Sequence, residues 1–421
     1  MSGLAGRTVF IPRMPASHAM LTAAAFRGCG IDARLVPESN DRTLSLARSC
    51  CSGEECYPLI VTLGDFLRIL VDEGHPAHAA AFFMPTSSGP CRFGQYADFI
   101  RTSLANRGYG DALVVSPTSE NAYDGLGADS TRLLRSAWRG FVAADYLVAM
   151  LLKIRPHEAV PGEADTAFEY AIDALCDVLA DPRRTLNMRS FLKGLRIARD
   201  RLRGVRTRPA PRVLIGIVGE IFCRNNEFSN MEIIRCLERH GAECWLPGLT
   251  EWVHYTNLEE KRRLRRFGTR PTLRLVKTGL RHRIQEHDES TIEALFRDDL
   301  ADRPEPAVAS MLALGSPYLP SEAALGEMAL SVARAVYLHR CGASGIVDIS
   351  PFTCMNAIVA EAVYPSISRD CDGIPIRTFY FDGTQANLDR DVGVFLQLAR
   401  SYAVGHSGAG LPRPIAAACK T

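Results

Sequence analysis

The chain has 421 residues, of which 47% are hydrophobic and 23% are charged, and its formal net charge is +2. This length predicts two or perhaps three folded domains, and each half is long enough to bury a core of its own. The small net charge argues against a global attraction to nucleic acid or to anionic membranes. No run reaches the roughly 18 apolar residues needed to span a bilayer, and residues 1–7 lack the apolar stretch of a secretory signal. We therefore expect a cytoplasmic protein with neither nucleic acid nor membrane as a partner.

Strands and helices alternate through the first half of the sequence. Turn residues and apolar periodicity predict strands at 8–12, 31–36, 79–84 and 112–115, and helices at 16–29, 58–73 and 95–107. Strands separated by helices of this length indicate crossover connections and a parallel sheet. Three further helices are predicted at 130–154, 164–180 and 188–202, so residues 1–205 are expected to form an α/β domain with a helical extension.

A basic, proline-containing stretch at 199–212 is interpreted as the linker, after which the alternation restarts. Strands are predicted at 213–218, 243–246, 345–349 and 377–381, and helices at 230–240, 328–340, 355–364 and 392–402. Residues 206–404 are thus expected to form a second α/β domain. The Gly-, Ala- and Pro-rich segment 405–421 is expected to be a flexible tail. The predicted fold class is α/β, with two open parallel-sheet, doubly wound, flavodoxin-like domains.

A basic helical insertion is expected in the second domain at about 255–300. Residues 261–283 contain ten Lys or Arg. A solvated helical insertion is favoured over a nucleic-acid site, because acidic residues flank the run and Phe267 is the one aromatic residue within it.

Thirteen cysteines, an odd number, are spread along the chain at spacings unlike those of a disulfide framework. In a reducing compartment, clustered cysteines more often bind metal or carry out redox chemistry. Several are interpreted simply as small buried hydrophobic residues, because apolar or helical neighbours surround them: Cys29, Cys176, Cys236, Cys244 and Cys341.

Three other cysteines stand in turn-rich loops before predicted helices: Cys56, Cys91 and Cys354. Cys91 and Cys354 also follow predicted strands, and the carboxyl ends of parallel strands are where open α/β sheets bind ligands. Soft thiolates select zinc, copper(I) or iron–sulfur clusters over hard cations. We therefore predict one shared metal or cluster site between the halves, with one position left open; the alternative is three unrelated loop thiols.

Further cysteines are reserve ligands. Cys51 and its neighbour Cys50 lie a few residues before Cys56, and Cys223 follows the strand predicted at 213–218. The chain lacks any Cys-x-x-Cys pair, phosphate-binding loop or nucleophile elbow. The sequence thus leaves open whether Cys50, Cys51 or Cys223 joins the ligand set.

The cysteine loops resemble those of a known family. The segments SGEECYP (52–58), TSSGPCRFG (86–94), GEIFCRNN (219–226) and SPFTC (350–354) look like the dehydratase-like module of acyl-CoA dehydratase activase-related proteins. That module belongs with the 2-hydroxyacyl-CoA dehydratases and double-cubane cluster proteins, and the resemblance runs from about Thr8 to Tyr402.

The resemblance implies a specific cofactor and partner. Cys56, Cys91 and Cys354 would bind a [4Fe-4S] cluster whose fourth iron is left for water or substrate, with a double cubane as the alternative. An ATP-hydrolysing activase, here expected as a separate chain, would pass an electron to the cluster. The reduced cluster would then act on the substrate thioester so that an unreactive hydroxyl is lost.

The expected function is that of a low-potential electron acceptor, charged by such an activase, that reduces or dehydrates a small substrate such as a 2-hydroxyacyl-CoA. Two alternatives stay open. One is a non-catalytic electron relay or activase-binding scaffold, and the other is a structural protein that holds zinc.

Overall fold

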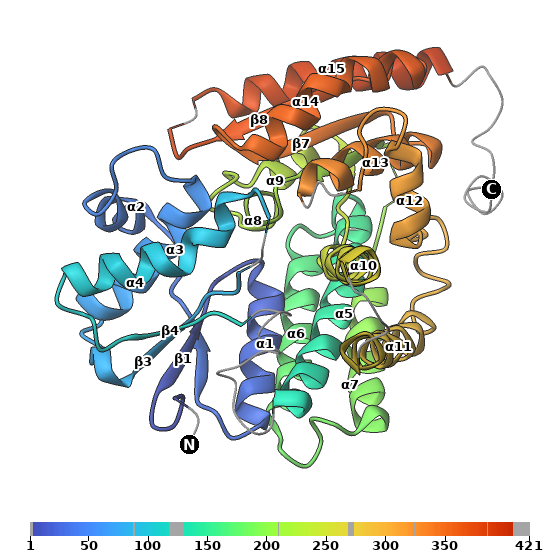
Figure 1. Cartoon of the computed structure of the whole chain (residues 1–421). Helices are drawn as coiled ribbons and strands as arrows, with labels where there is room; N and C mark the ends of the chain where they lie inside the picture. The colour runs from blue at the N-terminus through green and yellow to red at the C-terminus, as the bar shows by residue number, and fades with distance from the viewer. Residues whose placement is uncertain are drawn as a thin grey trace.

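The computed structural model describes residues 3–86, 89–117, 130–208, 210–267, 273–322, 326–384 and 386–406, and of residues 267 and 273–277 the backbone alone. Two four-stranded sheets organise the chain (Figure 1). The first consists of β1 (Thr8–Ile11), β2 (Ala33–Leu35), β3 (Ala80–Phe83) and β4 (Leu113–Val115) in the order β2-β1-β3-β4. The second consists of β5 (Val213–Gly219), β6 (Ala242–Trp245), β7 (Gly345–Pro351) and β8 (Ile376–Phe381) in the order β6-β5-β7-β8.

Every strand pair in both sheets is parallel. The predicted fold class, two open parallel sheets flanked by helices, is therefore confirmed. In each sheet the first strand lies between the second and the third, so the chain reverses its direction of travel across the sheet at β1/β3 and again at β5/β7. Such reversals leave a crevice at the carboxyl ends of the strands.

Alternate residues of the first sheet face different helices, as the two-residue period of a strand requires. Val9 and Ile11 pack in one core cluster with α1 (Ala16–Gly28). Phe10 and Phe82 face the opposite side, where they pack with α3 (Tyr57–Val71) and α4 (Tyr96–Asn106). This double burial explains why β1 and β3 are mostly apolar.

The second sheet is covered in the same way. One face packs against α9 (Ile233–Arg239) and α15 (Leu388–His406). The other packs against α13 (Glu327–Arg340), with α12 (Val308–Gly315) and α14 (Met355–Asp370) nearby. Figure 1 shows α15 running along the outside of this sheet.

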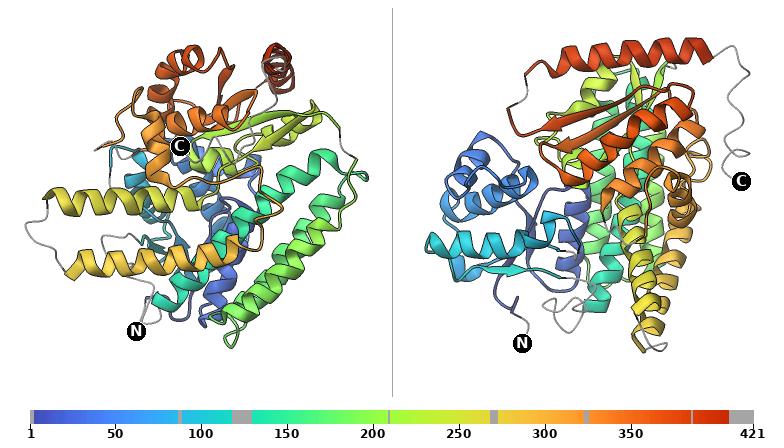
Figure 2. Two further views of the ribbon diagram at one scale, coloured as in Figure 1. Left: turned by 90° about the vertical axis from the view of Figure 1, so that its right-hand side faces the viewer. Right: turned by 45° about the horizontal axis from the view of Figure 1, so that its top comes forward.

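Long helices link the two halves. The extension after β4 consists of α5 (Ser130–Ile154), α6 (Glu163–Ala180) and α7 (Met188–Arg203), and the insertion after β6 consists of α10 (Thr250–Phe267) and α11 (Leu273–Glu293). Figure 2 shows α10 and α11 extending side by side from the body of the protein. One core cluster contains Leu21 of α1, Leu175 of α6 and Phe296 just after α11, so both halves contribute to it.

Several element boundaries differ from the prediction. The short helices α2 (Asp41–Arg48) and α8 (Ile221–Asn225) were not expected, and α14 continues through Pro365 to Asp370. Residues 199–203, expected in the linker, belong to α7, and Gly405 and His406, expected in the tail, end α15. The rest of the expected tail, 407–421, lies outside the described residues.

Among the described residues, none of the helices combines the length and apolar character that crossing a membrane requires.

Candidate functional site

Each of the three predicted cysteines occupies the position immediately before a helix. Cys56 is the N-cap residue of α3, and Cys354 is the N-cap residue of α14. Cys91 precedes the 3₁₀ turn Arg92–Gln95 that leads into α4, and its Sγ accepts a hydrogen bond from the Phe93 amide at 3.5 Å. Amides at a helix start favour negative charge, so these positions act in favour of the thiolate form, in opposition to burial.

Two of these positions coincide with the crevices of the sheets. Cys91 follows β3 and Cys354 follows β7, the strands at which the chain reverses direction in each sheet. Cys223, in α8, follows β5, the neighbour of β7. The predicted location at the carboxyl edges of the strands therefore agrees with the structure for these residues.

Arg92 connects the three cysteine loops. Its guanidinium donates a hydrogen bond to the carbonyl oxygen of Glu54, two residues before Cys56, at 2.7 Å. It also donates to the carbonyl oxygen of Thr353 at 3.1 Å and to the Thr353 hydroxyl at 3.3 Å. Since Arg92 itself follows Cys91, one side chain fixes the two other loops relative to its own, across the boundary between the halves.

The backbone beside Cys354 is strained. Thr353 has a φ of +62°, a left-handed conformation that a β-branched residue rarely adopts. Such a conformation persists only where its surroundings enforce it, and it is common at functional sites. In this conformation the carbonyl oxygen and the hydroxyl of Thr353 both accept hydrogen bonds from Arg92.

Burial dominates the electrostatics of the thiols. Cys56 and Cys354 are buried, whereas Cys91 is partly exposed. Burial raises the pKa of Cys56 to about 12, with the charge of Glu220 as the next cause, and it raises the pKa values of Cys91 and Cys354 as well. Without a cation these thiols stay protonated at neutral pH, and a bound metal would be needed to deprotonate them.

The thiols also influence one another. A charge on Cys91 raises the pKa of Cys56, and a charge on Cys56 raises the pKa values of both Cys354 and Cys223. Cys354 contributes in turn to the raised pKa of Cys223. Four thiols from separate loops thus lie close enough to interact electrostatically.

Two carboxyl groups, on the partly buried Glu220 and the buried Glu327, lie within electrostatic range of these thiols. Glu220 caps α8 by accepting hydrogen bonds from the Phe222 amide at 3.1 Å and the Cys223 amide at 2.7 Å. Glu327 accepts from the Ile221 amide at 2.8 Å. Burial raises the pKa values of both Glu220 and Glu327, and each charge in turn raises the pKa of Cys354.

Arg224 lies near Glu220 and Glu327. Its charge lowers the pKa values of Glu220, Glu327 and Asp348 against the larger effect of their burial. Among the described residues, Arg224 Nε is a buried donor without a hydrogen-bond partner. A buried guanidinium with a free N–H is suited to an anionic group.

This donor set fits an iron–sulfur cluster. Thiolates are the usual ligands of such clusters, and polar groups that donate to the sulfurs tune them. The hydroxyl of Tyr96 forms a hydrogen bond with Cys56, and Tyr96 is itself buried. The charges of the nearby Arg92 also favour the thiolate forms of Cys56 and Cys91.

Of the reserve ligands, Cys223 interacts with the predicted cysteine ligands, whereas Cys50 and Cys51 interact mainly with other residues. Cys223 shares electrostatic contacts with Cys56 and Cys354 and belongs to the same region. Arg107 donates a hydrogen bond to Cys50 Sγ at 2.8 Å. Burial raises the pKa of Cys51 to about 11, and the charges that add to this effect are those of Glu55 and Cys50.

The other cysteines occupy the positions expected of small apolar residues. Cys236, Cys244 and Cys341 are buried, and Cys29 and Cys176 are partly buried. Sequence reasoning had singled out the Glu220 loop but missed the roles of Glu327, Arg92 and Tyr96. A signal existed for Glu327 alone, as an acidic residue in the first turn of α13.

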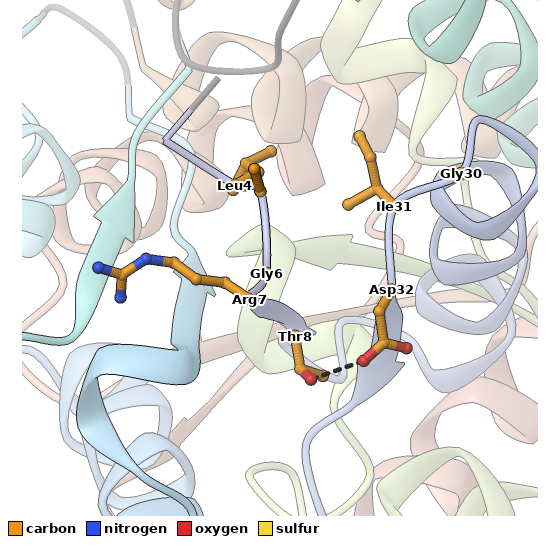
Figure 3. Close-up of a pocket in the computed structure, with 8 residues that line it drawn as sticks. Leu4, Gly6, Arg7, Thr8, Gly30, Ile31 and Asp32 are labelled. Atoms are coloured by element: carbon orange, nitrogen blue, oxygen red, sulfur yellow. Dashed lines mark hydrogen bonds between the residues drawn. The ribbon is translucent and has the colours of Figure 1, made fainter. Parts of the chain in front are cut away.

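A separate hollow of about 510 Å³ opens at the amino ends of β1 and β2, the edge opposite the cysteines. Figure 3 shows Thr8 hydrogen-bonded to Asp32 at 2.6 Å, with the Arg7 side chain directed away from this pair. Arg7 donates to the carbonyl oxygens of Ala80 and Asp111, at 3.0 and 2.9 Å. The Arg7 guanidinium is therefore already hydrogen-bonded to backbone carbonyl oxygens, and we assign no function to this hollow.

No protein-family model and no curated protein matches this chain.

Proposed function

We propose that this protein binds one [4Fe-4S] cluster through Cys56, Cys91 and Cys354 and serves as a low-potential electron acceptor. The observation that carries the proposal is the bridge formed by Arg92, which joins the loops of all three cysteines. Cys223, close to the same thiols, is the reserve ligand, and a double cubane is the alternative cluster.

The proposed reaction is the reduction or dehydration of a small substrate such as a 2-hydroxyacyl-CoA. The cluster would supply one-electron transfer and an open iron for a substrate oxygen. Glu220 and Glu327, whose pKa values burial raises, would be the groups that exchange protons near the leaving hydroxyl. The partly exposed Cys91 side would admit the substrate from solvent.

A separate ATP-hydrolysing activase is the proposed electron donor. An apolar patch next to Cys354 supports this partner: Phe352, Met355 and Ile358 are 57%, 42% and 53% exposed. Exposed apolar groups beside a redox site are suited to a transient protein contact, since such contacts place donor and acceptor close together.

Iron and sulfide analysis after anaerobic purification tests the proposal. We expect a brown protein with about four iron atoms per chain, or about eight for a double cubane. Cys91→Ser should lose most of the iron, whereas the matched control Cys341→Ser, which changes a buried thiol at the end of α13, should keep it. A colourless wild-type protein, or equal iron in both variants, would contradict the cluster proposal.

The second candidate is a cluster-bearing electron relay or activase-binding scaffold without a substrate. The exposed apolar patch at Phe352, Met355 and Ile358 favours it, because the patch serves a protein contact whether or not a thioester binds. Electron paramagnetic resonance distinguishes the two candidates. A dehydratase should change its cluster spectrum when acyl-CoA is added, and a relay should not.

A further inference from the structure

A second group of metal-binding side chains lies between α9 and α15, outside the cysteine site. Cys236 and His240 are four residues apart, so they share one face of α9 and its C-cap. Asp389 lies in the first turn of α15. One ligand atom from each residue lies within 4.8 Å of the other two.

The distances within this group suit a tetrahedral metal. Cys236 Sγ lies 3.6 Å from Asp389 Oδ1, and His240 Nε2 lies 3.0 Å from the same oxygen. With zinc bonds of about 2.3 Å to sulfur and about 2.0 Å to nitrogen or oxygen, a tetrahedron has edges of roughly 3.5 Å for S···O and roughly 3.3 Å for N···O. Both separations are within a few tenths of an ångström of these edges, so small side-chain movements suffice.

We propose that Cys236, His240 and Asp389 bind a divalent transition-metal ion, with zinc as the natural occupant. A thiolate, a neutral imidazole and a carboxylate are preferred zinc ligands, and their two negative charges neutralise the ion. Binding replaces the proton of the Cys236 thiol, which is released to solvent. The proposal is independent of the function proposed for Cys56, Cys91 and Cys354.

The surroundings of the three side chains leave room for a fourth ligand, and one nearby cation partly offsets the burial of the thiol. The charge of Arg239 lowers the pKa of Cys236 against the larger opposing effect of its burial. His240 is fixed through its backbone, since its carbonyl oxygen accepts a hydrogen bond from Arg400. Asp389 is 73% exposed, so water can complete the coordination from the solvent side.

The expected role is structural. α15 is held on the second sheet by Val392, Phe395, Leu396 and Ala399, all of which lie beyond its first turn. A metal on Asp389 would fasten that first turn to α9, which packs on the same sheet face. The ion would thus reinforce the start of α15, where Leu388 is only partly buried against the same core.

Metal analysis of the full-length protein tests the site. Zinc and iron per chain are measured by mass spectrometry after expression with added zinc and extensive dialysis. The variants are Asp389→Asn, which changes an exposed side chain of equal size, Cys236→Ser, and the control Cys341→Ser. Zinc affinity is measured separately by competition with a chromophoric chelator, and amide hydrogen exchange is followed in α9 and α15.

We expect one zinc per chain in the wild type and in Cys341→Ser. Asp389→Asn and Cys236→Ser should bind zinc at least about 100-fold more weakly, since even loss of a residue that supports a ligand costs 10–100-fold. Zinc should slow exchange at the start of α15 in the wild type and in Cys341→Ser, but not in Asp389→Asn or Cys236→Ser. Cys91→Ser should lose iron but keep zinc, which separates this site from the cysteine site.

The proposal is overturned if the wild type retains zinc no better than Asp389→Asn. It is also overturned if zinc binds only at millimolar concentration, or if bound zinc leaves exchange in α9 and α15 unchanged.

Discussion

At the residue scale, the relative positions of the cysteine loops depend largely on the guanidinium of Arg92. Arg92 reaches two loops at once because its planar fork holds several donors in fixed directions, which a lysine ammonium cannot reproduce. The three acceptors on Glu54 and Thr353 lie 2.7 to 3.3 Å from its terminal nitrogens. The spacing of the cysteine loops therefore depends on a residue that is itself no ligand.

Replacing Arg92 should weaken the site without unfolding the protein. We expect Arg92→Gln to retain iron about tenfold less well and Arg92→Lys to be intermediate, as is usual for residues that support metal ligands. Iron per chain and the rate of cluster loss in air are the measurements. Arg34→Gln, which removes an exposed arginine paired with Glu73 in the first half, should behave as wild type; equal iron in Arg92→Gln and Arg34→Gln would show that the bridge is irrelevant to the site.

Two glycines with positive φ give a matched test of packing beside the site. Gly219, at the end of β5, has a φ of +114°, and a Cβ there would overlap the Ile349 carbonyl oxygen and lie 2.6 Å from the Ile349 amide nitrogen. Gly342 has a φ of +90° but open space around it. Gly342→Ala should thus cost about 1 kcal/mol of backbone strain, whereas Gly219→Ala adds overpacking and should cost at least about 2 kcal/mol more. Urea unfolding measures both, and equal losses would contradict this account.

The residue scale also shows where sequence reasoning stops. Cys56, Cys91 and Cys354 could be predicted as helix-preceding loop residues because turn residues and apolar runs are local signals. The role of Arg92 could not be predicted, because its partner Thr353 is 261 residues away in the chain. Glu327 was missed for the same reason, since its contact with the Ile221 amide is also long-range.

At the element scale, the side chain of Asp145 caps the amino end of α10. The carboxylate lies on α5, yet it accepts hydrogen bonds from the amides of Leu249 and Thr250, at 2.8 and 2.9 Å, where α10 begins. It is also paired with His18 of α1 at 2.7 Å. One side chain therefore fixes the start of α10 and ties it to two helices of the first half.

Asp145→Asn should destabilise the protein in a pH-dependent way. Burial by itself would raise the pKa of Asp145, but His18 and the Thr250 amide outweigh it and lower that pKa. A lowered pKa contributes stability that is present above the unfolded value of about 3.9 and is lost as the pH falls through the folded value. We expect a loss of about 2 to 3 kcal/mol at neutral pH that shrinks below about pH 4. Unfolding free energies against pH measure it, with exposed Asp173→Asn as the control; a loss that does not change with pH would be inconsistent.

Helices were predicted best where the apolar pattern is long. The bounds of α5 agree with the expected 130–154 because the apolar stripe repeats over many turns. α2 was missed although Asn40 and Thr43 form a capping box, since only eight residues follow the cap. α14 was expected to end before Pro365, because proline usually ends a helix, and the continuation to Asp370 reflects tertiary packing of Ile367.

On the scale of the whole molecule, the halves are joined by a shared helical core and by a buried ion pair. Asp288 of α11 pairs with Arg139 of α5 at 2.8 Å and with Arg135 at 2.9 Å. Arg139 is 2% exposed and Arg135 is 43% exposed. The same carboxylate thus has one buried partner and one partner at the surface, both from the other half of the chain.

The stability of the whole protein should depend on the ion pair between Arg139 and Asp288. Arg139→Met should cost about 3 kcal/mol, because it removes the buried partner of Asp288 and leaves that carboxylate with the surface residue Arg135. Arg135→Met, acting on the same carboxylate, should cost about 0 to 1 kcal/mol. Because the core is shared, calorimetry should show one transition for both halves, and it should move to lower temperature in Arg139→Met. Two separate transitions, or similar shifts for the two variants, would refute this view.

The contact between Arg92 and Thr353 has a consequence for biosynthesis. Chains emerge from the ribosome amino end first, and amino-terminal units begin to fold during synthesis. The first sheet and two of its thiols are thus exposed long before the residues 261 positions later that complete the arrangement. A nascent or truncated chain presents an unfinished thiol set, so under the proposed function delivery of the cluster would have to wait until β7 and the start of α14 have left the exit tunnel.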